Sequence, residues 1–304
     1  MTFSQKLNQI LNTINWMKKI DMHFEAQSIL IAQNLIEHVK NKSRIDSLSE
    51  IEFKVFSQWG DDGIIQWLIN NLNIKEKTFV EFGVENYAES NTRFLLMNNN
   101  WSGFVMDGSE KKVKQILNSY YYWKYDLTAK TAFVDCDNIN SLITERFPNK
   151  SLGILHIDID GNDYWIWNAI SVVMPDVVII EYNSVFGLER PIPIPYKKIF
   201  TRSDAHPSCL YYGASIRALY LLATQKGYSF IGCNSAGNNA YFVRKDLLNE
   251  VVKEVSLEKG FVLSKFRESN LGSKELSYVG GKERINIIKD MPVYNVVTNE
   301  IEPL

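Results

Sequence analysis

The stretches Thr78-Phe-Val-Glu-Phe-Gly83 and Gly103-Phe-Val-Met-Asp107 decide the fold of this chain. Each is a short apolar run with an acid at or near its end, Glu81 in the first and Asp107 in the second. Strands that are apolar on both faces are typical of a parallel sheet covered by helices on two sides. Such sheets bind ligands at the carboxyl ends of their strands, so the two acids indicate a site for a nucleoside-type ligand.

The sequence around these stretches alternates between apolar runs and segments of helical periodicity. It predicts five parallel βα units, with strands at 78–82, 103–107, 131–134, 152–159 and 177–181. A helix at 215–225 and an antiparallel hairpin, 228–232 with 239–243, complete the pattern. We therefore expect a doubly wound, Rossmann-like α/β fold with a seven-stranded sheet, made of five parallel units and a terminal antiparallel hairpin.

Three regions are expected along the chain: a helical extension over residues 1–50, a ligand-binding domain over 51–250 and a C-terminal extension over 251–304. The first region has apolar residues at helical spacing, which predicts two helices packed either on the main domain or on a second subunit. Asp61 and Asp62 are candidate caps for the helix that follows. The last region carries no motif that indicates a role.

Composition excludes several classes of partner. The 304 residues include 33 basic and 35 acidic ones, a net charge of -2, which gives no reason to expect nucleic-acid or anionic-membrane binding. Three widely spaced cysteines, Cys136, Cys209 and Cys233, indicate neither a disulfide framework nor a zinc site. The apolar stretches are too short to span a bilayer. We expect a cytoplasmic protein without membrane insertion that acts on a small molecule.

The order of the predicted elements resembles the class I S-adenosylmethionine-dependent methyltransferases, whose seven-stranded sheet ends in such a hairpin. The segment His156-Ile-Asp158-Ile-Asp160-Gly161-Asn-Asp163 is similar to the signature of the FkbM-like branch, Lys-Ile-Asp-x-Glu-Gly-x-Glu, with Asp in place of Glu. The resemblance covers about residues 55–245. It implies S-adenosylmethionine as cofactor and methyl transfer to oxygen on a small polar acceptor, such as a sugar or a surface-polysaccharide precursor.

The cofactor residues expected from this resemblance are Glu81, Gly83, Asp107 and Asp135. Glu81-Phe-Gly83-Val-Glu85 matches the start of the glycine motif, although Glu85 replaces a second glycine, a change that disfavours a bound pyrophosphate. Gly83 would allow close approach of the backbone or simply form a tight turn. Asp107 would accept from the ribose hydroxyls, and Asp135 from the adenine amino group. Helix capping is the alternative role for both aspartates.

A cluster of acids is expected where the fourth and fifth strands end. Asp158, Asp160 and Asp163 follow one strand, and Glu181 and Asn183 end the next. Adjacent strands lie ~5 Å apart, so the carboxylates would share a cleft and need a cation or donors. A divalent metal, magnesium or manganese, held by Asp160 and Glu181 is one solution, similar to that of catechol-type methyltransferases, with Asp158 as a catalytic residue. The alternative is that these acids cap the next helix.

The proline-rich loop 182–212 follows the fifth strand, a usual place for substrate recognition. His206 in this loop is the candidate general base, because a neutral imidazole takes a proton near pH 7, although a structural role is the alternative. His156 is expected to be a core histidine. Two other function classes stay open: a metal-dependent glycosyltransferase that uses Asp158-Ile-Asp160, and a non-catalytic binding module that keeps the fold.

Overall fold

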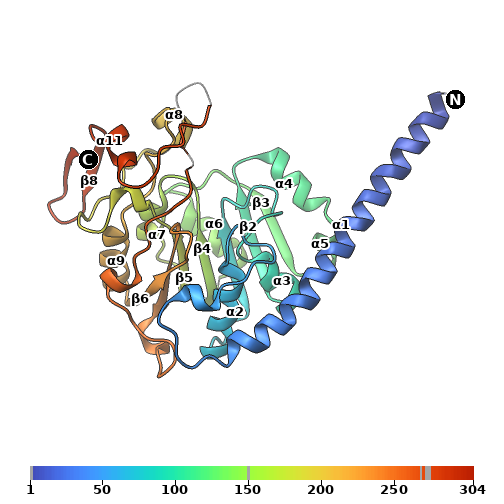
Figure 1. The fold of residues 1–304 in the computed structure, drawn as a ribbon, viewed down its shortest axis with the longest axis horizontal. Coiled ribbons are helices and arrows are strands. Elements are labelled where there is room, and N and C mark those ends of the chain that lie inside the picture. The colour runs from blue at the N-terminus through green and yellow to red at the C-terminus, as the bar shows by residue number, and fades with distance from the viewer. Residues whose placement is uncertain (1–2, 149–150, 268, 271–274) are drawn as a thin grey trace.

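The structure, a computed structural model, describes residues 3–148, 151–267, 269–270 and 275–304. Its centre is a seven-stranded sheet in the order β3-β2-β1-β4-β5-β7-β6 (Figure 1). The strands are β1 (Thr78–Phe82), β2 (Ser102–Asp107), β3 (Leu127–Thr131), β4 (Ser151–Ile157), β5 (Met174–Glu181), β6 (Tyr228–Cys233) and β7 (Asn239–Arg244). The first five are parallel to one another, and β7 pairs antiparallel with β5 and β6. The predicted doubly wound seven-stranded fold is confirmed.

Helices cover both faces of this sheet because the strands alternate their side chains between two apolar cores. Phe79, Val105 and Ile154 point into one core, and Val80, Phe104 and Leu155 into the other. The first core is covered by α1 (Phe3–Lys40), α2 (Asp61–Asn71), α3 (Arg93–Asn99) and α5 (Tyr120–Lys124). The second is covered by α6 (Ile139–Arg146), α7 (Asp163–Ala169), α9 (Ile216–Gln225) and α10 (Leu257–Gly260).

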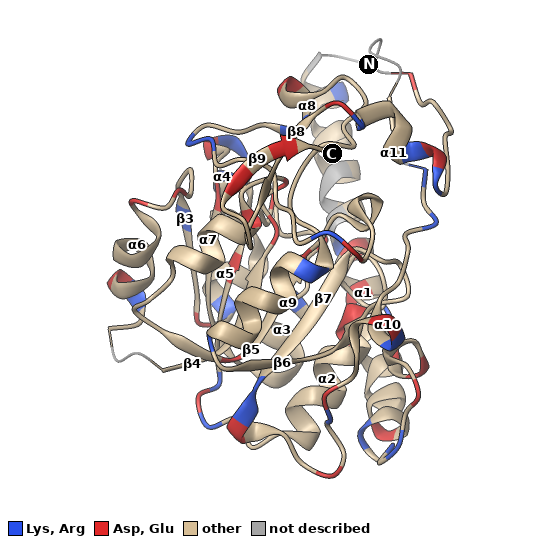
Figure 2. Cartoon of the chain, turned by 90° about the vertical axis from the view of Figure 1, so that its left-hand side faces the viewer, with Lys and Arg blue, Asp and Glu red and all other residues tan. Residues whose placement is uncertain are grey.

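The remaining elements are short and lie mostly in the connections. The 3-10 turns are η1 (Leu48–Ile51), η2 (Ser184–Phe186) and η3 (Lys245–Leu247). The other helices are α4 (Glu110–Leu117), whose Ile116 packs in the first core, α8 (Arg202–Ala205) and α11 (Glu283–Ile288). A separate antiparallel hairpin joins β8 (Pro292–Asn295) to β9 (Glu300–Pro303). Figure 2 shows acidic residues on β9, whereas β6 contains no charged residue.

The third strand lies earlier in the chain than the predicted 131–134. β3 covers Leu127–Thr131 and pairs only with β2, at the edge of the sheet. An edge strand does not need apolar residues on both faces, and the middle of β3 is only half-buried. The apolar residues Phe133 and Val134, which suggested a strand, instead line a cavity beyond it.

The N-terminal region forms one helix of 38 residues in place of the two that were predicted. The sequence contains no glycine or proline before Gly60, so nothing in it interrupts the helix. The C-terminal half of α1 packs on the body through Ile29, Ala32, Ile36 and Val39. Its N-terminal half extends away from the rest of the chain (Figure 1).

The C-terminal region packs on the loop after β5 and gives that loop its own small core. Ile288 and Val293 contact apolar residues of the loop, among them Phe186, Ile192, Phe200 and Tyr211. Most apolar residues of the loop form a cluster separate from the sheet, although Tyr182 at its start belongs to the second core. None of the helices in the described ranges has both the length and the hydropathy needed to cross a bilayer.

Candidate functional site

The site lies where the winding of the sheet reverses. β1 pairs directly with β4, although β2 and β3 lie between them in the sequence. The carboxyl ends of the strands at such a reversal form a crevice. Here it holds a larger cavity of about 480 Å³ and a smaller one of about 200 Å³. The two cavities adjoin, because both are lined by Gly83, Glu85, Asp158 and Asp160.

The loop after β1 has the backbone conformation of a glycine-rich loop with a single glycine. Gly83, Glu85 and Tyr87 have φ values of 75°, 50° and 62°. A Cβ atom on Gly83 would lie 1.6 Å from the backbone oxygen of Asp158, so only glycine lets the ends of β1 and β4 come this close. Glu85 stands at the position of the missing second glycine. It adopts a left-handed backbone conformation, which costs any residue other than glycine roughly 1–2 kcal/mol.

Asp107 ends β2 and lines the smaller cavity. Its two oxygens accept backbone hydrogen bonds from Glu85 N at 2.8 Å and Ser109 N at 2.7 Å. A carboxylate has about four lone-pair sites, so both oxygens can accept further donors. The facing wall is mainly apolar and includes Met106, Ala132, Phe133, Val134 and Phe200. An acid beside an apolar wall suits a nucleoside, which has ribose hydroxyls and a flat base.

Asp135 serves the turn before α6. Its Oδ1 accepts from the backbone N of Asp137 and of Asn138, both at 2.9 Å. It is not among the residues that line either of the two cavities. The N-cap of α6 is Asn138, so Asp135 forms the turn ahead of the helix and does not cap it as the alternative expected. Its contact with adenine stays a prediction.

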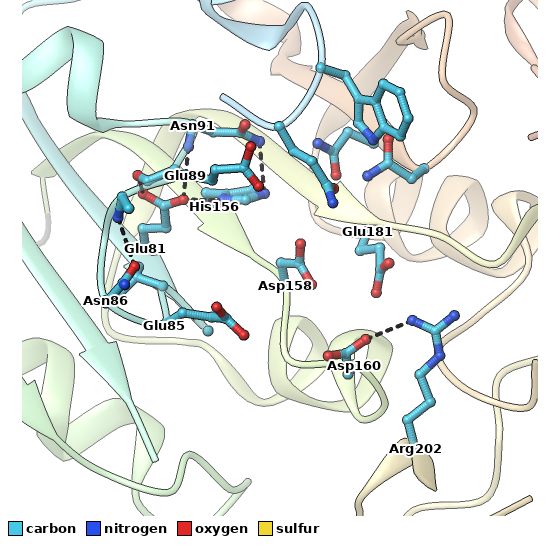
Figure 3. A pocket seen from close by; sticks show the side chains of 18 of the residues that line it. Glu81, Glu85, Asn86, Glu89, Asn91, His156, Asp158, Asp160, Glu181 and Arg202 are labelled. Carbon is cyan, nitrogen blue, oxygen red and sulfur yellow. Dashed lines mark hydrogen bonds and ion pairs between the residues drawn. The ribbon is translucent and has the colours of Figure 1, made fainter. Parts of the chain in front are cut away.

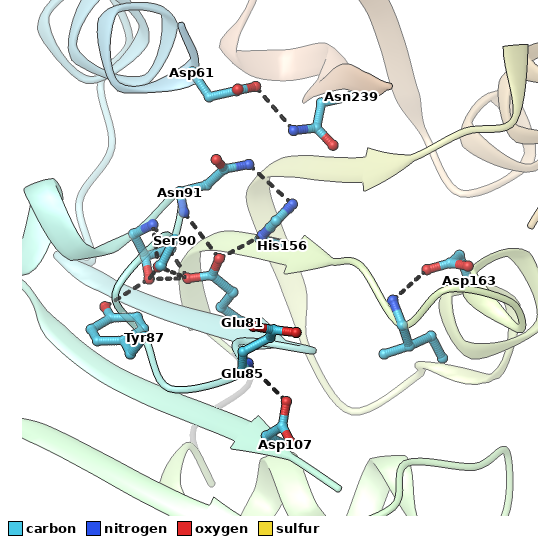
Figure 4. A network of polar contacts seen from close by, with 12 residues as sticks. Asp61, Glu81, Glu85, Tyr87, Ser90, Asn91, Asp107, His156, Asp163 and Asn239 are labelled. Carbon is cyan, nitrogen blue, oxygen red and sulfur yellow. Dashed lines mark hydrogen bonds and ion pairs between the residues drawn. The ribbon is translucent and has the colours of Figure 1, made fainter. Parts of the chain in front are cut away.

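Glu81 lies buried at the end of β1 with its carboxylate fully engaged (Figure 4). It accepts from five groups: Ser90 Oγ at 2.6 Å, Asn91 N at 3.1 Å, Thr92 N at 3.2 Å, Thr92 Oγ1, and His156 Nδ1 at 2.8 Å. Burial alone would raise the pKa of Glu81, but these donors, His156 first, lower it below its ordinary value. Burial opposes a charge on His156, yet Glu81 raises the pKa of the imidazole. Nε2 of the same ring lies 3.1 Å from Nδ2 of Asn91, so His156 bridges Glu81 and Asn91.

Asp158, Asp160 and Glu181 converge in the larger cavity, and each offers an oxygen within 4.8 Å of the others (Figure 3). Burial, with the charge of Asp160, raises the pKa of Asp158 to about 8. Burial and the neighbouring acids Asp158 and Asp160 raise the pKa of Glu181 well above its usual range. The Oε2 atom of Glu181 is buried without a hydrogen-bond partner. The cluster thus has unmet demand for a cation or for donors.

Two other polar residues expected near this cluster are used by the fold. Asp163 accepts from Ile159 N and Gly161 N, both at 2.9 Å, and so holds the turn between β4 and α7. Asn183 donates to the carbonyls of Leu210 and Tyr212 and fixes the loop after β5. The alternative role predicted for the acids, shaping the start of the next helix, is therefore what Asp163 does.

Asn239 supplies the amide of the site instead. It begins β7, lines the larger cavity and is buried, with 3% of its surface exposed. Its Nδ2 donates to Asp61 Oδ1 at 3.1 Å, and its own Oδ1 has no partner. Asp61 also accepts from Tyr241 Oη at 2.5 Å. Rather than capping α2, whose N-cap is Gly60, Asp61 fixes the orientation of the Asn239 amide.

Arg202 and two aromatic rings complete the larger cavity. Arg202, at the start of α8, binds Asp160 at 3.0 Å and lies over the ring of Tyr212 at 3.9 Å. Trp59 and Phe266 stack at the cavity wall with ring centroids 5.7 Å apart. Arg202 lies in the proline-rich loop 182–212, for which the sequence indicated substrate recognition. Trp59, Phe266 and Asn239 carried no local signal, because they come from segments far apart in the chain.

His206, the predicted base, lies just after α8 and lines neither cavity. Its Nδ1 lies 2.8 Å from Ser208 Oγ and 3.2 Å from Ser208 N, a contact within its own loop. Burial lowers the pKa of this imidazole. The structure does not bring His206 to the acid cluster, and its catalytic role stays a prediction.

Comparisons with known proteins give similarities at the level of overall shape. No protein-family model and no curated protein sequence matches the chain. Among solved structures, a S-adenosylmethionine-dependent methyltransferase from Clostridium acetobutylicum matches with a TM-score of 0.38 and 12% identity, covering 60% of this chain and 89% of that one. The O-methyltransferase from Bacillus cereus, in complex with S-adenosylhomocysteine (SAH), matches with a TM-score of 0.37 and 14% identity over 55% and 72%. The N-terminal domain of EvdMO1 with SAH bound matches with a TM-score of 0.35 and 10% identity, over 55% and 72%.

Proposed function

We propose that this chain is an S-adenosylmethionine-dependent O-methyltransferase of FkbM-like type that acts on a small polar acceptor. The observation that carries the proposal is the meeting of two unlike cavities at Asp158 and Asp160. The smaller cavity combines Asp107 with apolar walls, and the larger one is lined by carboxylates and amides. Two molecules bound side by side would therefore meet at these acids, which is what direct group transfer between them requires.

The smaller cavity would hold the nucleoside part of the cofactor. Asp107 would accept from the ribose hydroxyls, and Phe133 and Val134 would contact the base. S-adenosylmethionine supplies an electrophilic methyl group on a positively charged sulfonium. Glu85 favours a positive charge near the shared wall and disfavours phosphate groups. Glu85 also pairs with Lys112 at 2.6 Å, so the cation nearest this cavity is already engaged.

The larger cavity would hold the acceptor, and its walls favour a sugar or a surface-polysaccharide precursor. Carboxylates and amides such as Glu89, Asn238 and Asn239 can bind many hydroxyl groups. The stacked rings of Trp59 and Phe266 offer a flat apolar surface for the C–H face of a sugar ring. In the absence of an ion, Asp158 would take the proton of the acceptor hydroxyl, since a pKa of about 8 suits a general base near neutral pH.

A divalent ion, magnesium or manganese, is the finer part of this proposal. Asp158, Asp160 and Glu181 present the hard oxygen ligands that such ions prefer, and the unpartnered Oε2 of Glu181 lies among them. The ion would supply a positive charge that lowers the pKa of a bound hydroxyl. The chain's own contribution would be to hold three carboxylates together, with Arg202 restraining Asp160.

Binding of SAH by calorimetry tests the cofactor site. Asp107→Ala should weaken binding by about 10–150-fold, equivalent to the 1.5–3 kcal/mol of a charge-assisted hydrogen bond. Asp137→Ala is the matched control, because Asp137 follows the neighbouring strand but is exposed and lines neither cavity. It should leave the affinity unchanged. Equal affinity of Asp107→Ala and the unaltered protein would contradict the assignment.

The convergence of Asp158 and Asp160 also favours a second candidate, the metal-dependent glycosyltransferase. A sugar nucleotide brings a diphosphate, yet Lys112 and Arg202, the cations among the described residues of the two linings, both pair with acids. Heat stabilisation separates the candidates, because a ligand of the folded state raises the melting temperature. SAH should do so and a sugar nucleotide with manganese should not. The reverse result would support the glycosyltransferase. If neither ligand raised the melting temperature, a binding module without cofactor would be supported.

A further inference from the structure

Helix α1 leaves an apolar stripe uncovered along most of its length. Residues 3, 7, 10, 14, 17, 21, 24, 28, 31 and 35 follow spacings of four and three and read Phe, Leu, Ile, Ile, Met, Asp, Phe, Ser, Ile and Leu. We call these ten positions the α1 seam. Of its side chains, the described apolar ones are Leu7, Ile10, Met17, Phe24, Ile31 and Leu35, exposed by 48%, 56%, 56%, 63%, 63% and 38%.

The seam is distinct from the face by which α1 binds its own chain. That face carries Ile29, Ala32, Ile36 and Val39 in the core. It is fixed further by Glu25, which binds Arg93 at 2.7 Å and accepts from Tyr120 Oη. Phe24, Ile31 and Leu35 stay exposed although the helix is docked there. The intramolecular contact therefore leaves the seam free to bind another surface.

We propose that the seam binds the α1 seam of a second copy of this chain in an antiparallel coiled coil. An apolar repeat of 3.5 residues kept over more than three to four heptads is the pattern of a coiled coil rather than of a helix on a globular surface. The direction follows from Asp21. A parallel pair in register would place two Asp21 side chains together in the seam, where like charges repel.

An antiparallel register places the two Asp21 residues in different layers. Position 7 then lies level with 31 of the second copy, 14 with 24, and 17 with 21. Each of the first two layers joins two apolar residues, and in the third layer Asp21 of one copy lies level with Met17 of the other, next to the twofold axis. The two carboxylates are then offset by four residues, ~6 Å along the helix axis, which weakens their repulsion relative to the parallel pair.

The polar side of α1 argues against a membrane surface as the binding partner. Helices that lie on anionic membranes carry Lys and Arg on their polar face. Here the exposed polar residues of the N-terminal half are mostly uncharged, with Lys6 and Lys19 among Gln5, Asn8, Gln9, Asn12 and Thr13. A second helix needs no such positive charge, so the composition fits a protein partner with the same seam.

Light scattering coupled to size exclusion tests the association with the full chain. The unaltered protein should have twice the 35.1 kDa mass of one chain at tens of micromolar. The double variant Ile10→Glu/Phe24→Glu should be a monomer. The melting temperature of its α/β domain should not change, because both positions lie outside the cores. Asn12→Glu/Gln33→Glu adds the same charge away from the seam and should stay a dimer. The proposal would be overturned if the unaltered protein were a monomer or if the seam variant were a dimer. It would also be overturned if the unaltered protein bound anionic vesicles as a monomer.

Cysteine cross-linking tests the direction. Leu7→Cys/Ile31→Cys should form a covalent dimer on mild oxidation, because positions 7 and 31 meet only in the antiparallel pair. Leu7→Cys alone should not cross-link beyond the background of the parent, which has its own Cys136, Cys209 and Cys233. Efficient cross-linking of the single variant would show a parallel pair and overturn the antiparallel assignment. Neither test depends on the proposed methyl transfer.

Discussion

Two buried glutamates at strand ends, Glu81 and Glu181, show how differently the same side chain is used in this molecule. Glu81, at the end of β1, accepts from five protein groups and pairs with His156, and its pKa is lowered. Glu181, at the end of β5, lies among acids, leaves Oε2 without a partner, and its pKa is raised. Their exposed fractions, 2% and 7%, are similar. Burial therefore does not distinguish them, but their partners do.

The difference separates a part of the fold from a part that awaits a ligand. A buried carboxylate with all its hydrogen bonds made stabilises the folded state, whereas an unpartnered one costs free energy until a cation or donor binds. The β1 end is therefore the rigid side of the crevice, and the β5 end is the side at which binding is expected.

The largest expected effect is on stability. Glu81→Ala should lower the free energy of unfolding by about 3–5 kcal/mol, because it leaves His156 and the buried donors of the segment 90–92 without their acceptor. Glu181→Ala should leave the free energy of unfolding within about 1 kcal/mol of the parent or raise it, since it removes an unsatisfied group. Urea denaturation measures both. Equal losses in the two variants would contradict the distinction between the two ends.

Substitutions at the acid cluster beside β5 should affect turnover more than they affect stability. Asp160→Asn should lower turnover at least about 10²-fold in the presence of magnesium while SAH binding persists, because a ligand of the ion is lost. Asp137→Asn, a change of the same kind at an exposed acid, should have no effect. A chelator should abolish turnover of the parent. Full turnover in chelator would exclude the metal and leave Asp158 as the base.

The pH dependence of stability should come from the β5 end. The pKa values of Asp158 and Glu181 are higher in the folded protein than in the unfolded chain. Between about pH 4 and pH 8 the folded protein therefore binds more protons than the unfolded chain, and its stability falls as pH rises through this window. Glu181→Gln should flatten this fall by removing one such group. Melting temperatures measured at intervals between pH 5 and pH 8 without metal test it. A fall equally steep in the variant would argue against Glu181 as a source.

The smallest effect is expected for His206→Ala. A general base there would make turnover fall by roughly 10²–10⁴-fold. The contact with Ser208 and the position outside both cavities lead us to expect a change of less than about threefold, while Asp158→Asn should fall by at least about 10²-fold. Steady-state rates of the two variants under the same conditions decide which residue takes the proton.

The sequence was a good guide to the strands and to the acids at their ends. The runs at 78–82 and 103–107 correspond to β1 and β2 to within one residue. Asp158, Asp160 and Glu181 were expected to converge, and they do. Apolar runs and polar strand ends are local properties, and in a parallel sheet they fix the site edge without knowledge of long-range contacts. The placement of β3 was wrong, because an edge strand lacks the apolar signal of the central ones.

By itself, then, the sequence determined the strands of the sheet and the acids at their ends, whereas the pairing of β1 with β4 came from the structure. Only the tertiary structure decided which of those acids have partners. Glu81 meets His156 across 75 residues, and Asp61 turns the amide of Asn239 across 178 residues. Hydrogen-bond satisfaction depends on such distant contacts, whereas strand and helix formation depends on the apolar pattern of neighbouring residues, which is why one could be predicted and the other had to be seen.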